Sequence, residues 1–461
     1  TGVQTCALPI LNVFNFFIDA GPTVMLPVII TIIGLIFGLK ISRAFKSGLT
    51  LGIGFAGIKL ILDFMTTNVG PAAKAMVDRT GVKLDALDVG WGSIAAVTWA
   101  SPIIPILIFA ILLVNIVLLI LKRTHTLDVD IWNYHHMAIV GVMVYFVTKN
   151  VFLGVGASVV MAIATFKISD WSQPMVESFF GIPGVSLPTV SALSSLVIAW
   201  PLNWLLDRIP LFRKSKFTIK DAQKYLGFFG DSMIMGLVIG MVIGVLAGYD
   251  IKAVLQLGVS MSAVLVLIPK MTSLFMEGLM PISDAAQKWS QKKFKGTRLF
   301  IGLDAAVVVG NPDVITTALI IIPLTIALAL VLPGNRVLPF ADLAVVPFRV
   351  AMVVALTRGN LLKNIIIGLV VTASLLWCGS ATAPMLTAIA KSVGINLGTS
   401  SMLISSFAAT SMIQSYLVFI AFAYKPIIGI PVLLLAFAGA WYYFDGIKKV
   451  NHEMDEPLKA Q

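Results

Sequence analysis

The chain has 461 residues, of which 58% are hydrophobic and 12% are charged, and its mean hydropathy is +0.96. This composition excludes a soluble globular protein. It indicates a polytopic membrane protein that folds as one helical unit, because several apolar runs approach the about 20 residues that cross a hydrocarbon core. The net charge of +11 comes from basic residues in short loops, where they set membrane topology, so nucleic acid is not an expected partner. The two cysteines, Cys6 and Cys378, are far apart and there is no P-loop or HExxH motif, so neither a metal nor a cofactor is expected.

The first ten residues, TGVQTCALPI, have neither the basic start of a signal peptide nor the length of a membrane span. We expect residues 1–16 to form an N-terminal extension, of which the part before Leu11 is foreign to the protein. The mixed polarity of residues 68–83 predicts an interfacial helix that begins at Pro71. Apolar segments are expected at 17–39, 47–67, 102–121, 137–148, 150–168, 186–206 and 426–444, and basic loops at 40–46, 122–123 and 208–224.

Two apolar segments carry polar and helix-breaking residues together. Leu84–Pro105 and Ile301–Pro323 both read Leu-Asp, then small and apolar residues, then polar residues, then an apolar run with a proline. Glycine and proline disfavour a continuous helix, and an ionised carboxylate in apolar surroundings is costly. Two such segments in corresponding halves are the best sequence indication of a transporter's binding site. We therefore predict two re-entrant hairpins that build a substrate site.

The second half of the chain repeats the first at a constant spacing. Asp88 and Asp304 are 216 residues apart, because about six residues are inserted before the second aspartate, in QKKFKGTR. Such regularity indicates an internal duplication. The pairs spaced by 210 residues are Pro71 and Pro281, Gly38 and Gly248, Gly48 and Gly258, and Pro174 and Pro384.

The positive charges predict that the two copies are inverted. With the loop 40–46 inside, the segment before it starts outside, and the basic stretches 122–123 and 208–224 also fall inside. The first copy therefore starts outside and ends inside, which requires an odd number of crossings. The sequence thus predicts an all-α polytopic membrane protein. It has about eleven transmembrane helices in two inverted repeats, each with a re-entrant hairpin, as in alternating-access transporters. The expected divisions are a first repeat at 17–207, a basic cytoplasmic loop at 208–229, a second repeat at 230–422, and a last transmembrane helix with a cytoplasmic tail at 423–461.

Asp88 and Asp304 are the foremost candidates for binding a substrate. A carboxylate accepts hydrogen bonds from two hydroxyls of a polyol, and broken helices nearby expose further backbone groups. Alternatively, each aspartate caps a helix end or holds the other repeat. Trp91 and Trp99 flank the first hairpin, where an aromatic ring packs on the C–H face of a sugar alcohol; the alternative is an interfacial tryptophan.

Five further residues are candidates for contacts with a hydroxylated substrate. Ser93, Asn311 and Asp313 are expected hydroxyl partners, with helix caps and interhelical bonds as the alternative. His136 is expected to bind the substrate or to assist proton transfer from its hydroxyl, unless it is an interfacial histidine. Asp231 is expected to be either a site carboxylate or an N-cap.

Several motifs together resemble the galactitol-specific IIC family of the bacterial phosphoenolpyruvate-dependent sugar phosphotransferase system, in the same superfamily as the ascorbate IIC proteins. The resemblance implies a homodimer in the bacterial cytoplasmic (inner) membrane, with a substrate-holding core, a dimer-forming part and a site built by the two hairpins. GNPD at 310–313 and DSM at 231–233 depart from the family pattern, which leaves the particular polyol open. The matching stretches are GPTVMLP (21–27), GPAAKAM (70–76), DVGW (88–91), TWAS (98–101), DVDIWN (128–133), LAGYD (246–250), IGLD (301–304) and PGNRVLPFADLA (333–344).

The expected function is that of a permease that translocates galactitol or a related polyol by alternating access. A separate IIB protein, charged by a IIA protein, then phosphorylates the polyol, because this chain has no phosphorylation site of its own. One alternative is an ion-coupled secondary transporter of a polyol or sugar acid, whose membrane carboxylates carry protons. Another is an intramembrane aspartyl protease, in which Asp88 and Asp304 share a proton. Membrane lipid is the remaining expected partner.

Overall fold

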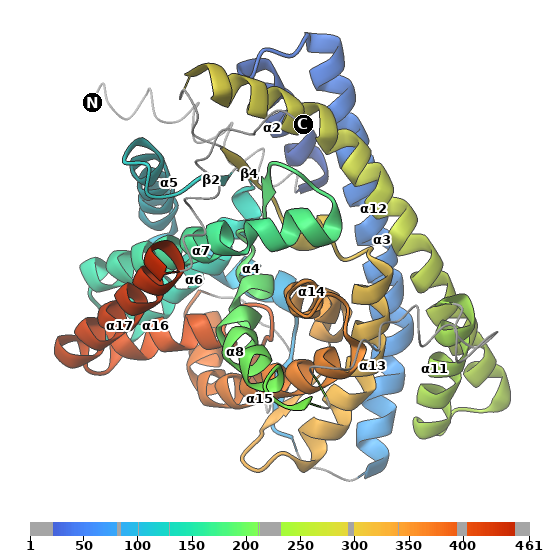
Figure 1. The fold of residues 1–461 in the computed structure, drawn as a ribbon. Coiled ribbons are helices and arrows are strands. Elements are labelled where there is room, and N and C mark those ends of the chain that lie inside the picture. Colours follow the sequence, from blue (N-terminus) through green and yellow to red (C-terminus); the bar gives the residue numbers. More distant parts are fainter. Residues whose placement is uncertain are drawn as a thin grey trace, which may run out of the picture.

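The computed structural model describes residues 22–80, 84–99, 101–128, 130–210, 212, 232–293, 299–339, 341–393 and 403–447 (Figure 1). The α-helices are α2 (Pro22–Ile36), α3 (Ile41–Thr80), α4 (Trp91–Trp99), α5 (Ile104–Ile120), α6 (Ile131–Thr148), α7 (Val151–Phe180), α8 (Val190–Leu206), α11 (Ser232–Leu246), α12 (Ile251–Lys293), α13 (Pro312–Val331), α14 (Val346–Leu356), α15 (Leu361–Ser392), α16 (Ile413–Ala423) and α17 (Pro426–Trp441). The short elements are the 3-10 turns η2 (Ala305–Val307) and η3 (Ala341–Val345), the π-helical turn η4 (Tyr442–Ile447), and the strands β1 (Ala86–Asp88), β2 (Thr126–Asp128), β3 (Val185–Ser186), β4 (Phe300–Gly302), β5 (Val337–Leu338) and β6 (Leu403–Ser405). The prediction of a mainly helical protein is confirmed. The prediction of an all-α fold is wrong in one respect, because the structure also contains the six short strands β1 to β6.

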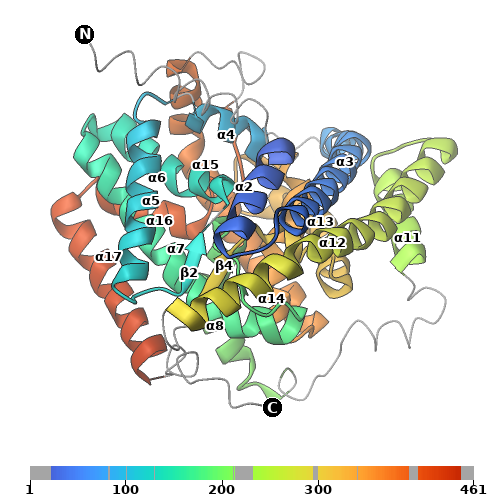
Figure 2. The same ribbon diagram turned by 90° about the horizontal axis from the view of Figure 1, so that it is seen from above.

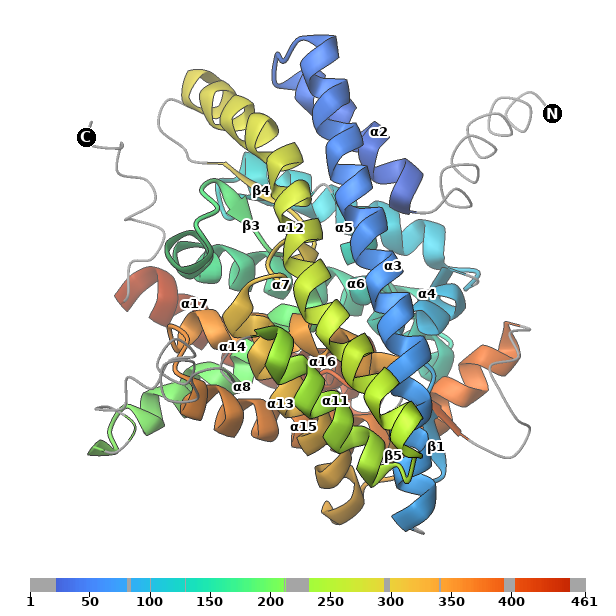
Figure 3. The same cartoon turned by 90° about the vertical axis from the view of Figure 1, so that its right-hand side faces the viewer.

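Four helices form an arm on one side of the molecule. The long helices α3 and α12 run side by side, α2 packs on α3, and α11 packs on α12 (Figures 1 and 3). Glycine permits the close approach in both pairs: a Cβ on Gly48 would lie 2.4 Å from the carbonyl oxygen of Pro27, and one on Gly258 would lie 2.9 Å from that of Leu237. Small residues let membrane helices pack closely, so the arm depends on these two equivalent glycines.

The expected interfacial helix beginning at Pro71 is wrong. Residues 68–80 continue α3 without a break, and Pro71 lies inside a helix of 40 residues. Proline removes one backbone hydrogen bond, which a helix in a membrane tolerates where its neighbours compensate. Packing of α3 along α12 keeps the helix continuous.

In the part of the chain that the structure describes, four helices are long and apolar enough to cross a membrane: α7, α13, α15 and the span Pro426–Ile447. Others of 10–17 residues, including α5, α8, α14 and α16, are apolar but shorter. The chain is therefore a multi-pass membrane protein by length and composition. The count of eleven crossings and the inverted orientation stay predictions.

The first of the two polar segments is broken as expected. Leu84–Pro105 forms β1, the nine-residue helix α4 and the start of α5. In the second segment, β4 and η2 make the break, but α13 then runs from Pro312 through Pro323 to Val331. The second break is therefore shorter than the segment Ile301–Pro323.

The strands connect the two halves of the chain. In one parallel sheet the order is β5-β1-β6, and in the other it is β2-β4-β3. The central strand of each sheet thus comes from one half and both of its neighbours come from the other half. An exposed ion pair continues this pairing, because Arg336 donates to both carboxylate oxygens of Asp85 and so lowers the pKa of that carboxyl.

The helices of the two halves recur at the spacing found in the sequence. α2 and α11, α3 and α12, and α7 and α15 each begin 210 residues apart. The caps recur too: Asn150 accepts from the backbone N–H of the third residue of α7, and Asn360 does the same for α15. The duplicated sequence pattern therefore corresponds to duplicated local structure.

The last helix, α17, lies at the edge of the molecule opposite α11 (Figure 2) and has no buried residue. The turn η4 anchors its end. Asp445 accepts from Nζ of the fully buried Lys167 at 2.9 Å and from Nε1 of Trp171 at 2.7 Å. The ion pair between the buried Lys167 of α7 and the partly buried Asp445 of η4 therefore holds the C-terminal end of α17.

Candidate functional site

Asp88 ends β1 and is completely buried. Its Oδ1 accepts from the backbone N–H of Gly90 at 3.3 Å, and its Oδ2 accepts from that of Asp342 at 2.8 Å. Gly90 has a φ of +84°, which glycine adopts without strain and which starts the turn into α4. Both oxygens of Asp88 therefore brace backbone.

Asp342, in η3, joins three separate segments. Its Oδ1 accepts from the backbone N–H of Trp91 at 2.8 Å, at the start of α4. Its Oδ2 accepts from Ser406 Oγ at 2.6 Å and from the backbone N–H of Ala408 at 3.0 Å, in the loop after β6. An anionic carboxylate at the positive N-terminus of α4 is favourable. Asp342 thus positions the first hairpin from the other half of the chain.

Arg349 supplies the positive charge beside these carboxylates. It is buried on α14, its Nη2 donates to the carbonyl oxygen of Asp342 at 3.2 Å, and it interacts electrostatically with Asp342 and Asp88. The guanidinium carbon lies 5.1 Å from the centroid of the Phe407 ring. The guanidinium therefore offsets part of the negative charge of the two buried carboxylates beside it.

Trp91 and His136 come together through His135. The ring centroids of Trp91 and His135 are 6.2 Å apart, and those of His135 and His136 are 3.9 Å apart. His136 is buried, and among the described residues its ring nitrogens make no close hydrogen bond, although the backbone of Ala408 lies near the ring. Buried polar groups are normally paired, so His136 is available to an additional hydrogen-bonding group.

Asp304 follows β4 and caps η2, with its Oδ1 accepting from the backbone N–H of Ala306 at 2.7 Å. Unlike Asp88, it is only partly buried. The neighbouring N–H of Ala305 donates to Thr189 Oγ1 at 2.8 Å, and that hydroxyl donates to Asn133 Oδ1 at 3.0 Å. The two predicted aspartates thus differ in burial, because Asp304 as a residue is partly exposed and Asp88 is not.

The first two turns of α6 reach both groups. Asn133 contacts the network of Asp304 through Thr189, while His135 and His136, two and three residues further on, face Trp91 and the backbone of Ala408. The arrangement is a buried polar cluster between broken segments of both halves. It offers carboxylate acceptors, an imidazole and an indole face, which are suited to a neutral ligand with many hydroxyls.

The remaining predicted residues have different placements. Asn311 caps α13 by accepting from the backbone N–H groups of Asp313 and Val314, which is the alternative considered for it. Asp313 lies against the turn before α15, where a Cβ on Gly359 would be 2.7 Å from its Oδ2. Ser93 and Trp99 lie on α4, but their side chains are outside the described part of the structure, as is all of Asp231.

Sequence reasoning missed Asp342 and Asp128 as site residues, although both occur in the family-like motifs PGNRVLPFADLA and DVDIWN. The presence of both aspartates in these motifs is the sequence signal that could have identified them. Asp128 ends β2, where its Oδ1 accepts from Asn133 Nδ2 at 3.0 Å. It therefore belongs to the same network as Asp304.

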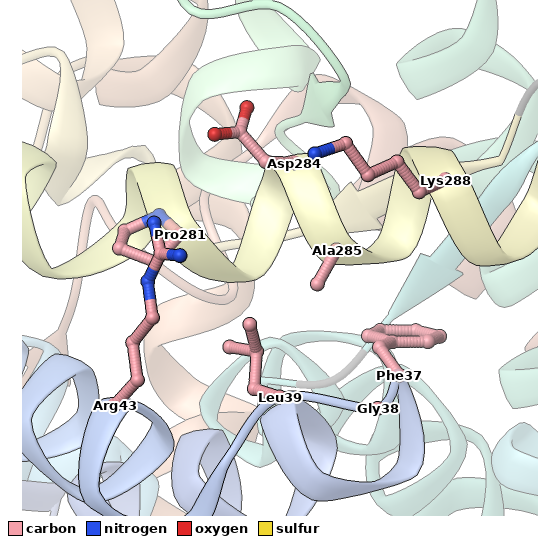
Figure 4. A pocket seen from close by; sticks show the side chains of 8 residues that line it. All are labelled: Phe37, Gly38, Leu39, Arg43, Pro281, Asp284, Ala285 and Lys288. Atoms are coloured by element: carbon pink, nitrogen blue, oxygen red, sulfur yellow. The ribbon is translucent and has the colours of Figure 1, made fainter.

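A separate pocket of about 430 Å³ lies between the turn that follows α2 and the C-terminal half of α12 (Figure 4). Apolar side chains of Phe37 and Leu39 face it from the turn, and Arg43 and Lys288 lie at its edge. None of the predicted site residues lines this pocket. The buried polar cluster therefore remains the candidate site.

Membrane-length helices around an internal polar cluster define a multi-pass membrane protein of the transporter class. The chain belongs to the family described as the sugar-specific permease component of the PTS system, whose model matches residues 16–400. It is 39% identical over 383 residues to the PTS system galactitol-specific EIIC component of Escherichia coli strain K12, covering 83% of this chain and 85% of that protein, and equally to the same component of E. coli O157:H7. It is also 37% identical over 399 residues to a putative permease IIC component of strain K12, covering 87% of this chain and 91% of that protein. The family resemblance recognised in the sequence is confirmed.

Proposed function

We propose that this protein carries galactitol or a closely related polyol across the bacterial inner membrane for phosphorylation by a separate IIB protein, which a IIA protein recharges. The observation that carries the proposal is the buried cluster of carboxylate, imidazole and indole groups held between broken segments of both halves. The galactitol-specific relatives support the choice of substrate.

In this proposal the predicted site residues have distinct roles. Asp304, which is partly exposed, accepts hydroxyl groups with its carboxylate, and Trp91 packs on the C–H face of the polyol. His136 takes the proton of the hydroxyl that attacks the phosphorus of the IIB phosphocysteine, whose thiolate leaves. Asp88 positions the hairpin, since both of its oxygens already bind backbone N–H groups. This geometry speaks against an aspartyl protease, which requires Asp88 to share a proton with Asp304.

Ser93, Trp99, Asn311, Asp313 and Asp231 remain proposed contacts of a second rank. The capping bonds made by Asn311 favour a structural role for it. For the others the sequence argument stands alone.

The transport cycle that we propose is alternating access by two inverted repeats with eleven crossings. The recurring spacing of 210 residues and the exchange of strands between halves support a duplicated unit. The positive-inside rule supports inversion, because the basic loops give the first copy an odd number of crossings. We further propose a homodimer formed through the arm of α2, α3, α11 and α12, which projects from the rest of the molecule (Figure 2).

The test is uptake of radiolabelled galactitol by membrane vesicles that contain this protein, with phosphoenolpyruvate and a cytosolic extract containing IIA and IIB. We expect phosphorylated polyol inside, with none formed when IIB is omitted. Asp304→Asn is expected to abolish uptake. Asp250→Asn serves as the matched control, because Asp250 is an exposed N-cap of α12 and asparagine retains the capping oxygen. Accumulation of free polyol that an uncoupler dissipates, without phosphorylation, would instead establish the ion-coupled transporter.

A further inference from the structure

Asp128 is held rigidly at the end of β2 and is 3% exposed. Its Oδ1 accepts from Asn133 Nδ2 at 3.0 Å and from the backbone N–H of Asp130 at 3.3 Å. Its own backbone N–H donates to Asn115 Oδ1 at 3.1 Å, and its carbonyl oxygen accepts from the hydroxyl of Tyr134 at 3.0 Å. The orientation of the carboxylate is therefore determined by its surroundings.

The other oxygen of this carboxylate, Oδ2, is buried and has no hydrogen-bond partner among the described residues. The carboxylates of Asp130 and Asp304 lie close enough to repel it electrostatically. An unpaired buried acceptor beside like charges is unfavourable. Asp128 Oδ2 can therefore accept a hydrogen bond from a bound ligand that carries a donor group.

The surroundings restrict the chemistry of that occupant. An anion is excluded by the neighbouring carboxylates. Within the described residues, no group of His, Cys, Asp and Glu is arranged to hold a metal ion. A neutral molecule with several hydroxyls satisfies the remaining requirement, because each hydroxyl donates one hydrogen bond and adds no negative charge.

We infer that Asp128 is a specificity-determining residue, whose Oδ2 accepts one hydroxyl of the polyol while Asp304 accepts another. This inference rests on the proposed function and extends it. The proposed site then has two carboxylates from different halves of the chain: Asp128 ends β2, and Asp304 follows the adjacent strand β4 by two residues. A polyol is recognised by the spacing of two of its hydroxyls.

The test is calorimetric binding of galactitol to the full-length protein in detergent, with both enantiomers of 1-, 2- and 3-deoxygalactitol as competitors. Each of these analogues lacks one hydroxyl of galactitol. The variant is Asp128→Asn. Its amide oxygen retains the bonds from Asn133 and Asp130, and its amide nitrogen takes the place of Oδ2 alone. Galactitol is expected to bind 10- to 100-fold more weakly to this variant. One analogue is expected to bind the variant and the unaltered protein equally, because the missing hydroxyl is the one that Oδ2 accepts.

Tyr134→Phe is the matched control, because it removes the brace on the Asp128 carbonyl without changing the carboxylate. It is expected to lower thermal stability and to preserve discrimination among the analogues. Equal or tighter binding of galactitol by Asp128→Asn, with discrimination intact, overturns the inference and makes Asp128 structural. Sodium-dependent binding that the variant renders sodium-independent also overturns it, in favour of a cation site. If the unaltered protein binds neither galactitol nor another hexitol, the proposed function itself fails.

Discussion

Replacing Asp342 by alanine is expected to disconnect the first hairpin from the second half of the protein. The carboxylate accepts hydrogen bonds from the backbone N–H of Trp91, the hydroxyl of Ser406 and the backbone N–H of Ala408, at 2.8, 2.6 and 3.0 Å. A hydrogen bond to a charged group contributes about 1.5–3 kcal/mol. Because the three bonds share one carboxylate, their contributions do not add fully. The expected loss in the free energy of unfolding is about 4 kcal/mol.

Two milder variants are expected to lose less unfolding free energy than Asp342→Ala. Asp342→Asn keeps one acceptor oxygen but turns an amide N–H₂ toward groups that also donate, so we expect a loss of about 2–3 kcal/mol. Ser406→Ala removes one of the three donors and leaves both backbone bonds, so a loss of about 1 kcal/mol is expected. The order of the three variants follows from the number of bonds each one removes.

The chain carries its own reporter for this measurement. Cys378 is 5% exposed on α15, so a thiol-reactive dye labels it only when the protein opens. Chemical denaturation of the full-length protein in detergent, with Cys6→Ser to remove the other thiol, yields the differences in unfolding free energy. The same variants are to be tested for galactitol binding, where Asp342→Ala should bind at least tenfold more weakly. If Asp342→Ala loses no more stability than Ser406→Ala and binds galactitol normally, the bracing role assigned to Asp342 is refuted.

Three other perturbations test separate parts of the structure. Asp445→Asn should cost about 2–3 kcal/mol in the same denaturation assay, because it deprives the buried Lys167 of its closest carboxylate; an unchanged stability would show that the pair does not anchor α17. Gly359→Ala should destabilise the protein by at least about 1 kcal/mol, since the backbone has a φ of +76° and the new Cβ would lie 2.7 Å from a carboxylate oxygen. The salt bridge between Asp85 and Arg336 lowers the pKa of Asp85, so its contribution is present above the unfolded pKa near about 3.9 and is lost as pH falls through the lower folded value. Both side chains are largely exposed, so a comparison of Arg336→Ala with the unaltered protein between about pH 7 and pH 3 should show a difference below about 1 kcal/mol that disappears at the acid end.

The sequence alone determined the class of protein, the two broken segments and the duplication. These properties are local or periodic: hydropathy accumulates over each apolar run, Asp88 and Asp304 interrupt apolar surroundings, and the spacing of 210 residues reappears in the helix starts. The sequence singled out Asp88, Trp91 and His136 separately as substrate contacts, and this role stays a prediction. The described contacts link Asp88 to Trp91 through Asp342, and Trp91 to His136 through His135.

The tertiary structure alone decided how the halves join and which aspartate is accessible. Strands of two or three residues have no detectable alternation, so neither the sheets nor their exchange between halves was predictable. Asp342 pairs with a backbone N–H 251 residues away, and no local pattern records such a partner. The continuity of α3 through Pro71 depends on its packing against α12. For the same reason Asp88 and Asp304, equivalent in sequence, differ in the structure: the loop of Asp342 covers the first, while the second stays partly exposed.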